Sequence, residues 1–290
     1  MTIVRRLMQS FGWWQSDSRV ALAAYVVMVA GMITTPLFER GSDERRVLAL
    51  VVVSALFVTS LSAAVRDHGS RSVVAALAIV VVTFLVEILG SKTGFPFGKY
   101  DYTSVLTPQL FGVPIIVSFA WAGITLTVHG ALRDVRIGHM RIGQMRTGRG
   151  SVDSGWQRNL GRTALMACAI TAWDAFLDPQ MVGEGYWQWQ PASPAYRGIP
   201  LVNYLGWLLT GSFTSAIVIA VCGRRKNHDK HGAKNDGASG LPRITYATLA
   251  VLSTIGFAIF FDDIVVAVVG GVTMGIFVWL SYASRTRWVA

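Results

Sequence analysis

Three acidic side chains lie within stretches of sequence that are otherwise apolar. Glu87 lies in the run Phe-Leu-Val-Glu-Ile-Leu, and Asp174 and Asp178 lie in the run Thr-Ala-Trp-Asp-Ala-Phe-Leu-Asp-Pro. Asp174 and Asp178 are four residues apart, so they share one face of a helix. Two carboxylates at this spacing repel each other, which favours the protonated form of at least one of them where water is scarce. Ionisable groups inside a membrane segment cost free energy and therefore indicate a functional site. Alternatively, Asp178 ends a helix at the membrane interface, because Pro179 follows it.

Aromatic, Gly and Pro residues are concentrated in short strings outside the apolar runs. Residues 94–102 read Gly-Phe-Pro-Phe-Gly-Lys-Tyr-Asp-Tyr, and further strings of these residue types lie at 186–189 and 196–200. One interpretation is a folded cap over an elongated apolar ligand. The other is a belt of Trp and Tyr side chains at the level of the lipid headgroups.

Acidic and aromatic side chains in a dry site favour acid-catalysed chemistry on an alkene. A buried carboxylic acid can donate a proton to a double bond. Aromatic faces and a nearby carboxylate can stabilise the resulting carbocation, and a second carboxylate can orient the attacking water. This chemistry requires no cofactor, and the sequence has no glycine-rich phosphate loop and no Cys/His metal cluster. We therefore expect neither a cofactor nor a metal.

The apolar runs that must position these side chains are long enough to cross a membrane. Of the 290 residues, 52% are hydrophobic and 14% charged, where a soluble domain has about 25% charged residues. A membrane helix needs about 20 mostly apolar residues. The candidate runs are roughly 20–38, 46–65, 73–90, 110–129, 160–177, 201–222, 244–261 and 264–283. The sequence predicts an all-α polytopic bundle of about eight transmembrane helices, a single integral domain over 1–290 in the cell membrane.

The distribution of basic residues predicts the orientation. With the N-terminus in the cytoplasm, about three quarters of the 26 Lys and Arg residues fall on the cytoplasmic side, as the positive-inside rule requires. Both termini are then cytoplasmic, as are the basic loops 130–159 and 223–243. The aromatic-rich loops 91–109 and 178–200 lie on the other side, together with the acidic candidates. The basic loops lack the interleaved aromatic residues that stack nucleic-acid bases, so the expected partner is the lipid bilayer and not nucleic acid.

Several strings together resemble the CruF-type carotenoid hydratase family of integral membrane proteins, a group that includes the bisanhydrobacterioruberin hydratases. The strings are 94–102, 112–114, 173–179, 185–189 and 198–207. The resemblance covers about residues 75–215. It implies cofactor-free addition of water to the terminal C1–C2 double bond of an acyclic carotenoid, which gives a tertiary alcohol. A lycopene-like or C50 polyene is the implied substrate.

The residue roles expected for this reaction follow from side-chain chemistry. Asp174 or Glu87 protonates the alkene, and Asp178 or Asp101 orients the water. The residues expected to line the substrate site are Phe97, Tyr100, Tyr102, Trp173, Tyr186, Trp187, Asn203 and Trp207. Two other functions remain open at this point. Intramembrane carboxylates also serve as proton relays in transporters, and the Asp174–Asp178 spacing occurs in membrane prenyl transferases that bind Mg²⁺-diphosphate.

Overall fold

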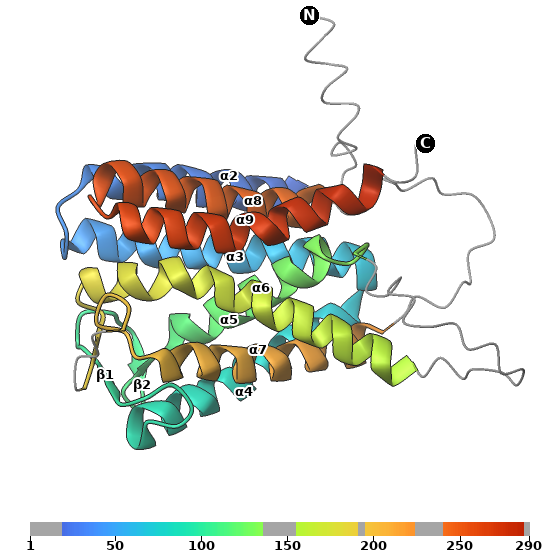
Figure 1. Cartoon of the computed structure of the whole chain (residues 1–290), viewed down its shortest axis with the longest axis horizontal. Coiled ribbons are helices and arrows are strands. Elements are labelled where there is room, and N and C mark those ends of the chain that lie inside the picture. Colours follow the sequence, from blue (N-terminus) through green and yellow to red (C-terminus); the bar gives the residue numbers. More distant parts are fainter. Residues whose placement is uncertain (1–18, 136–154, 191–194, 224–239, 287–290) are drawn as a thin grey trace, which may run out of the picture.

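Each apolar run contains an α-helix in the computed structural model, which describes residues 19–135, 155–190, 195–223 and 240–286 (Figure 1). In these ranges the helices are α2 (Arg19–Thr34), α3 (Asp43–His68), α4 (Ser70–Thr93), α5 (Ile115–Ala131), α6 (Gly155–Gly183), α7 (Leu201–Cys222), α8 (Gly240–Ile255) and α9 (Ile264–Thr286). A 3-10 turn, η2 (Thr35–Leu37), follows α2, and a π-helical turn, η3 (Gly256–Phe260), extends α8. The predicted all-α architecture is therefore confirmed.

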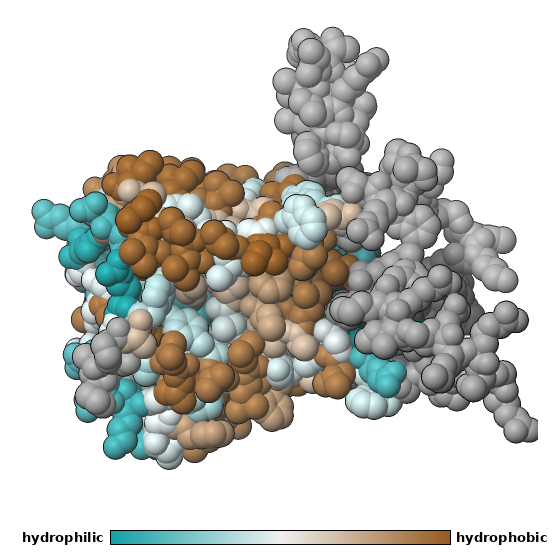
Figure 2. All heavy atoms as spheres, in the orientation of Figure 1, coloured by the Kyte–Doolittle hydropathy of each residue, from teal (hydrophilic) through white to brown (hydrophobic). Residues whose placement is uncertain are grey.

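The outer surface of the bundle suits a lipid environment. Six helical segments, α2 with η2, α3, α4, α7, α8 with η3, and α9, are long and apolar enough to cross a membrane, whereas α5 has 17 residues. Figure 2 shows apolar side chains along the flank of the bundle and polar ones gathered at the end that carries the α2–α3 turn. The chain is a polytopic membrane protein.

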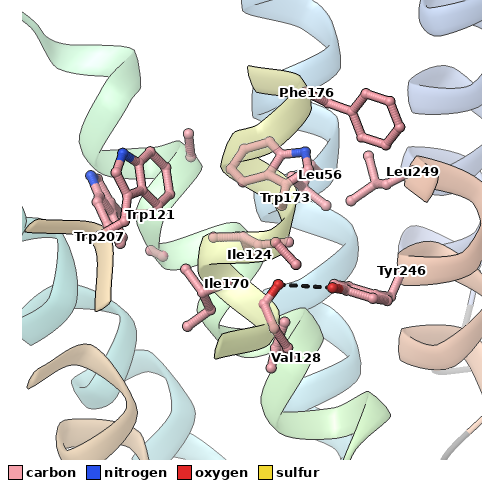
Figure 3. Packing of buried hydrophobic residues seen from close by; sticks show 14 of the residues in the cluster. Leu56, Trp121, Ile124, Val128, Ile170, Trp173, Phe176, Trp207, Tyr246 and Leu249 are labelled. Carbon is pink, nitrogen blue, oxygen red and sulfur yellow. Dashed lines mark hydrogen bonds between the residues drawn. The ribbon is translucent and has the colours of Figure 1, made fainter. Parts of the chain in front are cut away.

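One hydrophobic core joins the eight described helices. Its buried side chains include Met28 from α2, Trp121 from α5, Phe176 from α6 and Tyr246 from α8. Helix α5 is almost wholly buried from Ala120 to His129, so it forms the centre of the bundle. The Tyr246 hydroxyl donates a hydrogen bond of 2.8 Å to the carbonyl oxygen of Ala169 and so links α8 to α6 within the core (Figure 3).

A cap of two connections covers one end of the bundle. β1 (Tyr100–Tyr102), between α4 and α5, pairs antiparallel with β4 (Trp187–Trp189), between α6 and α7. In the same connection as β1, β2 (Gln109–Leu110) and β3 (Val113–Pro114) form a second short pair. Side chains alternate across a strand. The side chains of Tyr100, Trp187 and Trp189 are therefore buried, while those of Asp101 and Gln188 face outward.

The structure moves several predicted boundaries. The loops expected at 91–109 and 178–200 begin later, because α4 extends to Thr93 and α6 to Gly183. The fourth run was expected to start at residue 110, but α5 starts at Ile115 because 109–114 form the second hairpin. Most of the expected basic loops, namely 136–154 and 224–239, lies outside the described residues.

The interpretation that α6 ends at Pro179 is wrong. Proline lacks the N–H that would bond the carbonyl four residues earlier, here that of Ala175. That carbonyl instead accepts a hydrogen bond of 3.2 Å from the hydroxyl of Tyr196, in the connection before α7. The helix therefore continues past the proline and carries Asp178 in its interior.

Candidate active site

Glu87 lies at the centre of a cage of hydrogen-bond donors beneath the cap. Its side chain, in the last third of α4, is 5% exposed. Its Oε2 accepts hydrogen bonds from the hydroxyls of Tyr100 (2.6 Å) and Tyr102 (2.8 Å) of β1. Its Oε1 accepts one from the indole Nε1 of Trp121 on α5 (3.0 Å). Burial opposes ionisation of this carboxyl group, and the three donors stabilise its ionised form.

The two tyrosines of the cage remain donors over a wide pH range. Burial raises the pKa of the Tyr100 and Tyr102 hydroxyls well above the ordinary value, and the negative charge of Glu87 raises it further. A neutral phenol keeps its proton and can donate it to the carboxylate. The cap therefore supplies Glu87 with fixed, uncharged donors.

Asp174, Asp178 and Asn203 form a second buried polar cluster. The Asn203 Nδ2, on the first turn of α7, donates to Asp174 Oδ2 at 2.8 Å and also to Asp178 Oδ2. The indole Nε1 of Trp187, on β4, donates to Asp178 Oδ1 at 3.1 Å. Asp174 Oδ1 is buried without a hydrogen-bond partner among the described residues. One amide thus holds two carboxyl groups that lie one helical turn apart.

A small cavity of about 40 Å³ brings the two clusters together. Glu87 from α4 and Asp178 from α6 both line it, as does Asn203 from α7. The other lining side chains are mostly aromatic: Phe97, Tyr100, Tyr102, Trp121, Trp187, Trp189 and Trp207, with Val117, Ala120 and Leu177. Carboxyl groups from two helices therefore face one space walled by aromatic rings.

Close packing fixes the aromatic walls. The rings of Trp121 and Trp207 stack with centroids 4.1 Å apart, and Trp173 meets Trp207 edge-on at 6.2 Å (Figure 3). Gly206, beside Trp207 on α7, lets the cap approach the helix. A Cβ at this position would lie 2.8 Å from the carbonyl oxygen of Pro96 and 2.6 Å from the Phe97 ring. No side chain fits in that space, so the glycine seats Phe97 in the wall.

A larger cavity of about 270 Å³ adjoins the small one. It lies among α2, α3, α5, α6 and α8, and its lining is mainly apolar. Four residues line both cavities: Val117 and Ala120 of α5, Leu177 of α6 and Trp187 of β4. The small cavity, called the acidic cavity below because Glu87 and Asp178 line it, is therefore separated from the larger, apolar one by a single layer of side chains.

The structure places most predicted site residues at these two cavities. Glu87, Asp178, Phe97, Tyr100, Tyr102, Trp187, Asn203 and Trp207 line the small cavity. Trp173 and Tyr186 line the larger one. Asp174 does not line the small cavity, but it accepts a hydrogen bond from Asn203, which does. The structure does not bring Asp101 into the site, because its exposed carboxylate bonds Gln190 on the outer face of the cap.

Four residues at the cavities had no role in the site predicted from the sequence. Trp121 donates to Glu87, and Trp189 lines the small cavity. Arg45 and Glu184 form a buried ion pair at the larger cavity, with side chains only 4% and 3% exposed. A lone indole among small residues in an apolar run was the available signal for Trp121. The pairing of Arg45 with Glu184, 139 positions apart, left no local signal.

No group of three or more His, Cys, Asp or Glu side chains converges closely enough to hold a metal ion in the part of the chain that the structure describes. The groups at the site can donate and accept protons, surround a cation with aromatic faces and exclude bulk water. These are the requirements of proton transfer to an apolar substrate.

Comparisons with known proteins point to carotenoid biosynthesis. A family model described as carotenoid biosynthesis protein matches residues 45–278. The bisanhydrobacterioruberin hydratase of Haloarcula japonica is 28% identical over 151 residues, which cover 49% of this chain and 43% of that relative. The chain therefore matches less than half the length of this relative. No solved structure matches the chain. The family model spans most of the chain and includes every residue of both cavities except those of α2 and η2. The protein therefore belongs to the carotenoid biosynthesis protein family.

Proposed function

We propose that this protein is a cofactor-independent hydratase of the cell membrane that adds water to the terminal C1–C2 double bond of an acyclic, lycopene-like carotenoid. One observation carries the proposal: Glu87 and Asp178, from different helices, line one small aromatic cavity that adjoins a larger apolar one. The hydratase name of the relative from Haloarcula japonica supports the same reaction class.

The proton donor in this proposal is Asp178, supported by Asp174. Two buried carboxyl groups that share one amide donor cannot both ionise easily, so the pair holds a proton between them. Asp178 is the member of the pair that lines the cavity. It therefore delivers the proton to the alkene, and Asp174 keeps the pair protonated. This assignment replaces delivery by Asp174 itself or by Glu87.

Glu87 is the counter-charge and base. After C2 accepts the proton, the positive charge lies on C1, which bears the two methyl groups. The Glu87 carboxylate and the rings of Trp121 and Trp207 stabilise this cation. A water molecule attacks C1 and releases one proton to Glu87, which forms the tertiary alcohol. Transfer of that proton back to the Asp174–Asp178 pair completes the cycle, so one water is consumed and no charge accumulates.

Pigment analysis tests the function. The chain is expressed in cells that make lycopene, beside an Asp178→Asn variant and an Asp101→Asn control whose carboxylate lies outside the cavity. We expect the wild type and the control to form pigments that are heavier by one water for each hydrated end. Asp178→Asn should leave the pigment unchanged. Unmodified pigment from the wild-type strain, with the protein present in the membrane, would show that the proposed reaction is wrong.

A further inference from the structure

The larger cavity is too small to enclose a whole carotenoid. Pockets that bury a drug-sized ligand have volumes of about 300–1,000 Å³, and this cavity has about 270 Å³. A lycopene-like chain is larger than a drug-sized ligand. The cavity can therefore take only one end segment of such a chain, and the rest must lie elsewhere.

The cavity opens on the lipid-facing flank of the bundle. Three of its lining side chains are also exposed on the surface: Ile33 of α2 (56%), Ile255 at the end of α8 (42%) and Phe260 of η3 (49%). All three are large and apolar, as are Val26 and Val27, which are exposed on α2. The gap between α2 and η3 therefore faces the hydrocarbon of the bilayer.

Polar and charged groups close the cavity toward the cap end. Arg45 pairs with Glu184, and its Nε donates to the carbonyl oxygen of Phe38 at 2.9 Å. Its guanidinium lies 5.3 Å from the centre of the Phe261 ring, and Arg40 approaches the same ring at 5.3 Å. A chain of hydrocarbon cannot enter through this ion pair, because the charges would have to separate in a dry site.

We propose that the larger cavity binds the end segment of a linear hydrocarbon chain that enters sideways from the bilayer between α2 and η3. The chain tip passes Leu177 and Trp187 into the acidic cavity, and the remainder stays in the lipid. The identity of the chain as a polyene rests on the proposed function. In consequence the protein recognises the end group that enters the cavity, and its affinity does not depend on the group at the other end of the chain.

Two matched alanine variants test the site. Ala49 of α3 is half-buried and lines the larger cavity, whereas Ala24 of α2 is half-buried and lines a shallow hollow between α2 and α3. Ala49→Phe fills the cavity, and Ala24→Phe adds the same side chain elsewhere. Ser253→Phe fills the cavity from α8 and serves if Ala49→Phe fails to fold. Each variant is purified, placed in lipid nanodiscs and checked by thermal unfolding.

Binding and reaction are measured separately with two polyenes, one with two open ends and one with a ring at the far end. Binding is followed by circular dichroism induced in the polyene absorption band, and reaction by product mass. We expect wild type and Ala24→Phe to bind both polyenes equally. The cavity-filling variants should lose binding by about tenfold or more, the scale on which a hydrophobic pocket responds to one or two methylene groups.

Two results would overturn the inference: wild-type binding by the folded cavity-filling variants, or binding of the ring-ended polyene that is weaker by about tenfold. A third result separates this inference from the proposed reaction. In it, the wild type binds the polyenes and the cavity-filling variants do not, but no protein forms a hydrated product. It would refute the proposed reaction and uphold the chain-binding cavity.

Discussion

At the scale of single residues, the site depends on which indole nitrogens have a partner. Trp121 and Trp189 both line the small cavity and both are buried. The Nε1 of Trp121 donates to Glu87, whereas the Nε1 of Trp189 has no hydrogen-bond partner among the residues that the structure describes. The two residues therefore form a natural pair for measuring what the cage around Glu87 contributes.

Trp121→Phe removes one donor from a buried carboxylate and keeps an aromatic ring against Trp207. A hydrogen bond to a charged group contributes about 1.5–3 kcal/mol. We expect Trp121→Phe to lower the free energy of unfolding by that amount more than Trp189→Phe, as measured by thermal unfolding in one detergent. Equal losses in the two variants would show that the indole does not support Glu87.

Asp101 shows how a sequence can mislead within a correctly identified string. The string Tyr-Asp-Tyr forms a strand, in which neighbouring side chains point to opposite sides. Because Tyr100 and Tyr102 face Glu87, Asp101 faces outward. Three residues are too few to show this alternation before the pairing with β4 is known. Asp101 therefore has the same carboxylate group as the other acidic candidates but does not lie near them.

At the scale of elements, α6 continues past Pro179, and another part of the chain bonds the Ala175 carbonyl that the proline leaves without a helical partner. Tyr196 donates to Ala175, and this contact keeps Asp178 within a helical turn of Asp174. The string at 196–200 thus supports α6 through Tyr196, in addition to forming part of the cap.

Tyr196→Phe leaves the Ala175 carbonyl without this donor. We expect a loss of about 0.5–1.5 kcal/mol in the free energy of unfolding. In a Pro179→Ala background the loss should be smaller, because the alanine N–H can bond the same carbonyl. Tyr204→Phe is the control, since the Tyr204 hydroxyl is buried with no partner in the described ranges. Equal losses for Tyr196→Phe in both backgrounds would contradict this account of α6.

The buried pair of Arg45 and Glu184 ties the start of α3 to the residue that follows α6. Removing one partner leaves an uncompensated buried charge and costs about 3–5 kcal/mol. We therefore expect Arg45→Met to destabilise strongly. Arg45→Met combined with Glu184→Met should recover most of the loss, because neither charge then remains. A double variant no more stable than the single one, by thermal unfolding, would show that the pair acts through something other than charge.

The sequence predicted the helices better than the contacts between them. Apolar runs identify membrane helices locally, since each helix satisfies its own backbone hydrogen bonds. The same runs placed Glu87 and Asp178 at one membrane face, but their meeting in one cavity depends on how α4, α5, α6 and α7 pack. The β1–β4 pairing could not be predicted either, because three-residue strands carry no periodic signal.

At the scale of the whole molecule, both described chain ends lie opposite the cap. The start of α2 and the end of α9 lie at one end of the bundle, and β1 and the α2–α3 turn lie at the other (Figure 1). From the positive-inside rule we propose that the first end lies in the cytoplasm. The acidic cavity, beneath the cap, then lies in the outer half of the membrane.

Reporter fusions test this orientation. We expect green fluorescent protein to fluoresce when it is fused after Ala290, because it folds in the cytoplasm. Alkaline phosphatase, which is active only outside the cytoplasm, should be active when fused after Gly185 in the cap. The reverse pattern would invert the orientation, although the geometry of the site would be unchanged.

In the proposed mechanism, Asp178 and Glu87 carry out acid-catalysed hydration in one dry cavity. The most direct measurement is a single turnover of an open-ended polyene by purified protein in D₂O, with wild type, Asp178→Asn and Glu87→Gln compared. We expect one deuterium bound to carbon C2 of the alcohol, and a rate lower by about 10²–10⁴-fold in each variant. Product without deuterium on carbon, or wild-type rates in both variants, would contradict this mechanism.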